Sequence, residues 1–180
     1  MTDNGSDPFE EFVRRRSPHL FQLALLLTGR NQADAQDLLQ VALERAWRRR
    51  RAIARTDNPE PYVRPVLVNA SIDRWRWLGR RDERSLDTTR PGPMVADPAS
   101  EVARRDLLMR SLAALPPRQR AVLVLRYWES LPEKEVAEVL GCSVGTVKSQ
   151  ASRGLARLRE LAGPPVGAAV RHAEVRNGHD

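Results

Sequence analysis

Apolar residues recur at helical spacing along most of this chain, and this periodicity constrains the fold more than any other feature. The clearest stretch runs from Asp34 to Arg50, where apolar residues follow the i, i+3, i+4, i+7 pattern without a miss. They are Ala35, Leu38, Leu39, Ala42, Leu43, Ala46 and Trp47. No stretch alternates apolar and polar residues between hairpin turns, as antiparallel strands would. The sequence therefore predicts an all-α fold.

Two more helices are expected in the first eighty or so residues. One begins directly after Asp7-Pro8, a capping residue followed by proline at the first helical position, and runs to Leu27 with a kink at Pro18. The other begins near Pro61 and ends around residues 79–81. Within that helix we expect Trp75 in the core, because it shares a face with Ile72.

Four shorter helices are expected after residue 100. They cover 101–115, 117–128, 132–140 and 143–159. Pro116-Pro117 separates the first two, Gly141 ends the third, and Ser143 is a candidate N-cap of the fourth. Ala121, Val122, Leu125 and Trp128 are expected to share one face of the second.

The positive charge is divided between two parts of the chain. The formal net charge of the 180 residues is +7, with +4 on residues 1–80, −2 on 81–103 and +5 on 104–162. Ser85 to Ser100 holds three prolines and a glycine and few residues able to build a core, which is typical of a linker. We therefore expect two small helical domains, 8–82 and 104–162, joined by a flexible Pro-rich linker at 83–103 and followed by a disordered tail at 163–180.

Composition excludes several classes of protein. A single cysteine, Cys142, cannot close an intramolecular disulfide, which argues against a disulfide-stapled secreted domain. Apolar runs are far short of the roughly 20 residues that span a bilayer. The polar, acidic first ten residues lack the pattern of a secretory signal. We expect a cytoplasmic protein without membrane insertion.

Candidate catalytic residues are scattered. His19, His172 and His179 form no pattern with a nucleophile, and neither a glycine-rich phosphate loop nor a metal-binding repeat is visible. We therefore expect no enzyme activity, no catalytic residue, no cofactor and no metal site.

The basic residues favour nucleic acid as a partner. Only Lys134 and Lys148 are lysines among 30 basic residues, and arginine provides the planar, multiple donors that suit phosphates and base edges. Arginine richness also follows from a GC-rich genome, so composition alone only suggests DNA or RNA binding.

A helix-turn-helix pattern is the strongest local signal. Between Glu133 and Gln150, a short helix containing Ala137, a turn at Gly141 and a second helix with Val147 have the required spacing. Outward positions of the second helix carry hydrogen-bond donors. An ordinary helical hairpin with a solvated basic face remains the alternative.

Several motifs give a specific resemblance. LPPRQR at 115–120, LRYW at 125–128 and EVAEVLGCSVGTVKS at 135–149 resemble the C-terminal promoter-binding domain of extracytoplasmic-function sigma factors of bacterial RNA polymerase. QDLLQVALERAW at 36–47 and PYVRPVLVNASIDRWR at 61–76 resemble the N-terminal domain of the same factors. The resemblance covers about 150 residues in the expected order, and it implies promoter-specific initiation with core RNA polymerase.

The resemblance also implies roles for three sets of residues. A docking face for the clamp helices of the largest polymerase subunit would comprise Asp37, Gln40, Val41 and Glu44; many relatives carry an acidic residue in place of Val41. Minus-10 recognition and melting would use Asn69, Asp73, Arg74, Arg76, Trp77, Arg80 and Arg81. Minus-35 recognition would use Ser143, Thr146, Lys148, Ser149, Ser152, Arg153 and Arg157.

Plainer interpretations of these residues stay open. The face around Asp37 could be merely solvated, and Asn69 could be a capping or core amide. Relatives often differ from this chain at Gln150 and Ala151, so the promoter sequence does not follow.

Other partners and other functions also stay open. The family implies the polymerase flap as a further contact. Many relatives are held by an anti-sigma factor, although no feature of this chain proves one. The competing functions are a stand-alone helix-turn-helix regulator and a nucleic-acid enzyme.

Overall fold

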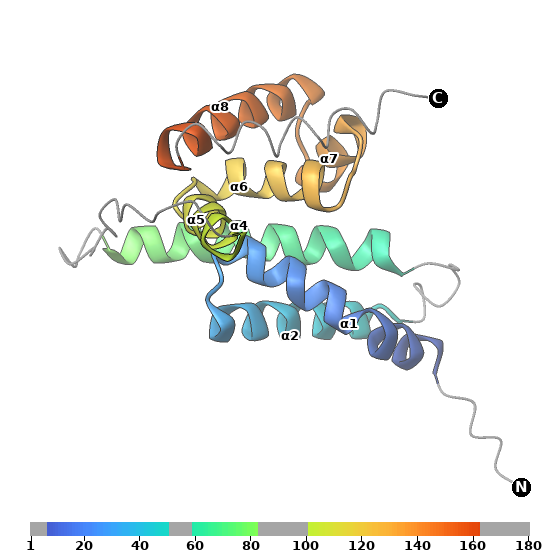
Figure 1. Cartoon of the computed structure of the whole chain (residues 1–180). Coiled ribbons are helices and arrows are strands. Elements are labelled where there is room, and N and C mark those ends of the chain that lie inside the picture. Colours follow the sequence, from blue (N-terminus) through green and yellow to red (C-terminus); the bar gives the residue numbers. More distant parts are fainter. Residues whose placement is uncertain (1–6, 51–58, 83–100, 163–180) are drawn as a thin grey trace, which may run out of the picture.

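The computed structural model describes residues 7–50, 59–82 and 101–162, and within them every element is helical, which confirms the all-α prediction. The first three helices are α1 (Pro8–Leu27), α2 (Gln32–Arg48) and α4 (Glu60–Asp82). They are followed by α5 (Glu101–Ala113), α6 (Pro117–Leu123), a π-helical turn η1 (Val124–Trp128), α7 (Glu133–Leu140) and α8 (Val144–Ala162), as Figure 1 shows. Most of the expected linker and all of the expected tail lie outside the described residues.

The start of α1 follows from its capping sequence. An oxygen of the Asp7 carboxylate accepts a hydrogen bond from the backbone N–H of Phe9 at 2.9 Å, and Pro8 occupies the first helical position. Pro18 lies inside α1, which continues to Leu27 as one element. The turn into α2 needs two left-handed residues, Gly29 and Arg30, with φ of +68° and +69°.

The N-terminal helices pack through the periodic apolar residues. Helix α2 contacts both α1 and α4. Its residues Ala35, Leu38, Ala42 and Ala46 are buried, whereas Trp47 keeps 39% of its surface exposed. Trp47 belongs to the apolar stripe but lies at its rim, with its ring tilted by 57° against that of Phe9 and the Arg50 guanidinium 4.0 Å from its ring centre.

A π turn changes the register after α6. The Glu129 N–H donates to the Val124 carbonyl at 3.1 Å, five residues back, so the turn is wider than in an α-helix. Val122 and Leu125 are buried, but Trp128 is 47% exposed. Trp128 therefore does not share the face of Val122 and Leu125 that α-helical spacing assigns to it, because the wider turn rotates it away.

The N-terminal helices and the helices after residue 100 pack against each other. Helix α4 contacts α6 and α7, and α1 contacts α5, α6 and η1. Figure 1 shows α6 and α7 lying along one side of α4. One buried cluster joins residues of both parts, including Leu67 and Val68 of α4 with Leu125 and Val136. Apolar burial of this kind stabilises the contact between the two parts.

Candidate nucleic-acid interface

Helices α7 and α8 form a helix-turn-helix whose turn is set by two residues. Gly141 has φ of +59°, and a Cβ there would meet nothing within 4 Å, so glycine serves the left-handed backbone rather than a close approach. The Ser143 hydroxyl accepts from the backbone N–H of Thr146 at 3.1 Å, which confirms it as the cap of α8. Val136 and Val147 are fully buried between the helices. The outer face of α8 is therefore held in a fixed orientation.

The predicted minus-35 residues occupy this helix and its cap. Ser143, Lys148, Ser152, Arg153 and Arg157 are exposed, and Thr146 and Ser149 are half-buried. The half-buried pair are engaged locally, since Thr146 Oγ1 lies 2.9 Å from Ser143 Oγ and Ser149 donates to the Thr146 carbonyl. Arg153 makes no hydrogen bond or ion pair with another described residue, whereas Arg157 pairs with Glu160 at 3.0 Å. Long exposed donors on one helix face suit a major groove.

The predicted minus-10 residues lie on α4. Asn69 and Asp73 are exposed, and Arg74 forms an ion pair with Asp34 of α2. Asn69 is exposed, so it does not sit in the core, and its amide donates to the carbonyl of Val139 in the last turn of α7 at 3.4 Å, a contact of the capping kind. The side chains of Arg76, Trp77, Arg80 and Arg81 lie outside the described residues.

Trp75 does not lie where the sequence predicted. It is 47% exposed, whereas Ile72 is 6% exposed. Three residues turn an α-helix by about 300°, so Trp75 sits about 60° around the axis from Ile72, enough to leave the buried face.

The four predicted docking residues form one exposed face of α2. Asp37, Gln40, Val41 and Glu44 all face solvent, opposite the buried alanine and leucine stripe. Val41 keeps 38% of its surface exposed, so this apolar side chain lies outside the core. Gln40 and Glu44 also border an apolar groove of about 670 Å³ between α1 and α2 that includes Phe9 and Trp47.

Arg120 is a buried charge that sequence reasoning missed. Its side chain is 2% exposed, and its guanidinium donates to the carbonyls of Leu112, Ala113 and Leu115 and, at 2.8 Å, to that of Leu27 at the end of α1. Burial lowers the pKa of Arg120 to about 10, so it stays protonated at neutral pH. The motif LPPRQR showed that an arginine was there but not that it reaches helix α1.

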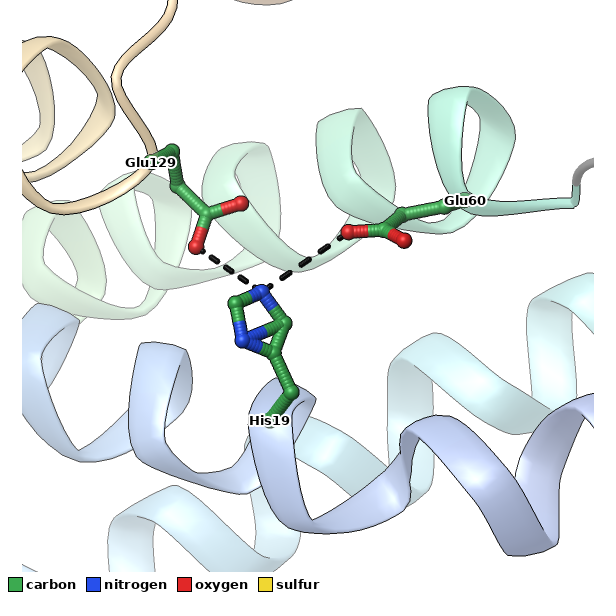
Figure 2. Close-up of side chains that lie close together, drawn as sticks. All are labelled: His19, Glu60 and Glu129. Carbon is green, nitrogen blue, oxygen red and sulfur yellow. Dashed lines mark ion pairs between the residues drawn. The ribbon is translucent and has the colours of Figure 1, made fainter.

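A cluster of charges around His19 was also missed. His19 of α1, Glu60 of α4 and Glu129 after η1 point toward one another, with His19 Nε2 3.0 Å from Glu129 and 3.7 Å from Glu60 (Figure 2). Their ligand atoms lie within 4.8 Å of each other, as in a metal site. Arginines already pair with both carboxylates, however: Arg16 and Arg64 with Glu60, and Arg64 with Glu129. We therefore interpret the group as an ion-pair cluster; residues so far apart in sequence leave no pattern that could have predicted it.

In the part of the chain that the structure describes, none of the helices combines the length and apolar character needed to cross a membrane.

Two family descriptions match the chain. "Sigma-70 region 2" matches residues 12–81, and "Sigma-70, region 4" matches residues 105–158. The chain is 43% identical over 152 residues to an RNA polymerase sigma-E factor of Streptomyces avermitilis, covering 84% of this chain and 83% of that protein. It is 33% identical over 155 residues to the ECF RNA polymerase sigma factor SigM of Mycobacterium tuberculosis, covering 86% and 77%.

Solved structures share the fold. The sigma factor RpoE of Bartonella quintana, solved in complex with the anti-sigma factor NepR, superposes with a TM-score of 0.65 at 24% identity, over 85% of this chain and 95% of that one. CnrH, solved with the cytosolic domain of CnrY, gives a TM-score of 0.54 at 23% identity, over 85% and 86%.

Proposed function

The chain belongs to the sigma-70 family, in the group of extracytoplasmic-function sigma factors, and on this basis we propose how its parts divide the work of initiation. It is a sigma factor that directs RNA polymerase to promoters. Residues 8–82 dock on the polymerase and read and open the minus-10 element, and residues 104–162 read the minus-35 element. Residues 83–103 act as the tether between them.

The observation that carries this division is the outer face of α8. Its exposed donors, led by Arg153, are held by the Ser143 cap and the Gly141 turn in the geometry of a groove-reading helix. The α2 face at Asp37, Gln40, Val41 and Glu44 supports docking on the clamp helices, because it is exposed and the core does not use it. A stand-alone regulator would not need this second surface.

Further partners follow from the same proposal. The polymerase flap would contact the C-terminal half, and the chain would act in the cytoplasm with its polymerase. RpoE of Bartonella quintana was solved with an anti-sigma factor, which supports a similar partner here. We assign the chemistry of nucleotide addition to the polymerase and no catalytic step to this chain.

Run-off transcription tests the proposal. Core polymerase alone, the chain alone and the two together are each offered a library of genomic promoter fragments. We expect discrete transcripts only from the combined reaction, since binding to free DNA should be weak and salt-sensitive. Specific duplex binding without core, together with no transcript from the combined reaction, would support the stand-alone regulator instead.

A further inference from the structure

The two parts of the chain meet across an interface that is partly ionic. We call the contact of α1 and α4 with α5, α6, α7 and Glu129 the closed interface. Among the described residues, its polar contacts include Arg64 and His19 with Glu129, Arg120 with the Leu27 carbonyl, Asn69 with the Val139 carbonyl, and Arg30 with Asp106 at 3.3 Å. A Cβ on Gly29 would stand 2.8 Å from the Cβ of Ala113, so the backbones also approach closely.

Glu129 carries the most buried carboxylate among the ion pairs of the closed interface. Its side chain is 2% exposed, and it enters a site formed entirely by the N-terminal half. Arg64 Nε donates to one of its oxygens at 3.0 Å. His19 Nε2 lies 3.0 Å from the other oxygen, as Figure 2 shows. A carboxylate this deeply buried is tolerated only while its partners stay in place.

The π turn explains why Glu129 reaches that site. The wide turn ends with the Glu129 N–H on the Val124 carbonyl, and Ser130 then takes φ of +54°, a left-handed backbone that reverses the chain. The Leu131 N–H closes the reversal on the Leu125 carbonyl at 3.0 Å. Glu129 therefore stands at the tip of a tight bend that points toward α1 and α4.

The site on the N-terminal side stays satisfied when Glu129 leaves. Arg64 also donates to Glu60, four residues before it on α4, at 2.8 Å, and Arg16 pairs with the other oxygen of Glu60. After separation these charges keep one another as partners, and Glu129 becomes hydrated. The two halves can therefore separate and rejoin without leaving a buried charge that has no partner.

The closed interface is incompatible with reading two promoter elements, and this step rests on the proposed function. Centres at minus-10 and minus-35 are about 25 base pairs apart, which is about 85 Å of B-DNA at about 3.4 Å per base pair. In the closed chain, Asn69 of the minus-10 helix touches Val139 of the helix-turn-helix at 3.4 Å. Residues 83–100 can span at most about 60 Å when fully extended, so opening also needs the helical halves to reach toward their elements.

We propose that Glu129, seated between Arg64 and His19, is an ionic latch that holds the free chain closed, and that engagement with polymerase and promoter opens it. Opening exposes part of the apolar cluster that the two halves share. Contacts with polymerase and promoter must therefore offset the lost apolar burial. The latch thereby disfavours promoter binding by the free chain.

The opening of the free chain is measured first, without polymerase. Spin labels at Ala33→Cys and Ala156→Cys, in a Cys142→Ser background, report the separation of α2 and α8 by double electron-electron resonance. Both labelled positions are exposed. We expect Glu129→Gln to raise the ratio of open to closed chain by about ten- to a hundredfold, the range expected for a lost charge-assisted hydrogen bond. His19→Gln, at a half-buried site, should shift the ratio in the same direction if Glu129→Gln fails to fold.

The matched control is Glu160→Gln. This exposed glutamate pairs only locally with Arg157, so its loss should leave the ratio unchanged. Equal separations in the wild type, Glu129→Gln and His19→Gln would overturn the latch. An equal shift in Glu160→Gln would also overturn it, because the effect would then be one of net charge.

A covalent lock tests the consequence for transcription. Arg30→Cys and Asp106→Cys, in the same background, replace an exposed pair that bridges the interface, and a short thiol-reactive linker would join them. We expect the linked chain to lose at least about tenfold in run-off transcription relative to the same protein left unlinked. Full activity of the linked chain would overturn the claim that the closed chain is inactive. Inactivity of every form, linked or not, would contradict the proposed function, while the separation measured in the free chain still decides the latch.

Discussion

Arg120 shows how one residue can hold the ends of two helices. Its guanidinium meets backbone carbonyls at the end of α5 and at Leu27, groups that lack partners within their own helices. Those carbonyls would otherwise be buried without donors, which is costly. The arginine therefore serves the fold, although an arginine-rich chain suggests DNA contacts for any arginine.

Replacing Arg120 with alanine should destabilise the protein by about 2–4 kcal/mol, because several buried acceptors lose a charged donor at once. Urea unfolding followed by circular dichroism measures this change. Arg118→Ala is the control, since Arg118 is exposed two residues away and should cost less than about 0.5 kcal/mol. Equal stability of the two variants would show that the Arg120 contacts do not contribute.

Arg153→Ala should weaken promoter use through the minus-35 element. A lost base-edge contact is worth about 1–3 kcal/mol, or roughly 5- to 150-fold in affinity. The measurement is run-off transcription on templates with the element intact or scrambled, and only the intact template should respond. Arg159→Ala removes another exposed arginine of α8 as a control. The same loss on both templates would remove Arg153 from the reading face.

The helices themselves were largely predictable, because each carries its own start and stop signals. Asp7-Pro8, Ser143 and Gly141 act locally, and the structure uses all three as expected. The exposure of three tryptophans was not predictable, for a different reason. Periodicity tells which residues share a face, but the exposure of Trp47 and Trp75 depends on whether another element covers that face. The exposure of Trp128 depends on the π turn, which helical periodicity in the sequence does not predict.

Gly141→Ala should cost about 1 kcal/mol of folding stability. The added Cβ would meet open space, so the penalty is that of a left-handed alanine alone. Thermal and urea unfolding measure it. Gly145→Ala is the matched control, because Gly145 lies inside α8 and its added Cβ would stand 3.8 Å from the Ser143 hydroxyl, an ordinary contact. Helix propensity predicts that this change raises folding stability by up to about 1 kcal/mol. A neutral Gly141→Ala would show that the turn can rearrange.

The double change Asp37→Ala and Gln40→Ala should weaken binding to core polymerase by about tenfold or more, as expected for the middle of a docking face. Both side chains are exposed, so helical content should be unchanged. Fluorescence anisotropy of labelled chain titrated with core gives the affinity, with the exposed Gln32→Ala as control. Undiminished binding would make this face merely solvated.

For the molecule as a whole, the sequence predicted two basic helical parts and a linker, but it did not predict that the parts touch. Helical periodicity and charge counts describe each part separately. Contacts such as Arg64 with Glu129 join residues 65 positions apart, and only the folded chain reveals them. The candidate site was therefore predictable as sets of residues on α2, α4 and α8, while the closed interface between the two parts was not.

Site-specific photo-crosslinking on a transcribing promoter tests the division of labour between the two halves. A photoreactive residue is placed at Trp75 on α4 or at Ala156 on α8, both exposed. In the complex with core polymerase, we expect crosslinks from position 75 at the minus-10 element and from position 156 at the minus-35 element, about 25 base pairs away. Crosslinks from both positions to one stretch of DNA, or the same pattern without polymerase, would contradict the account.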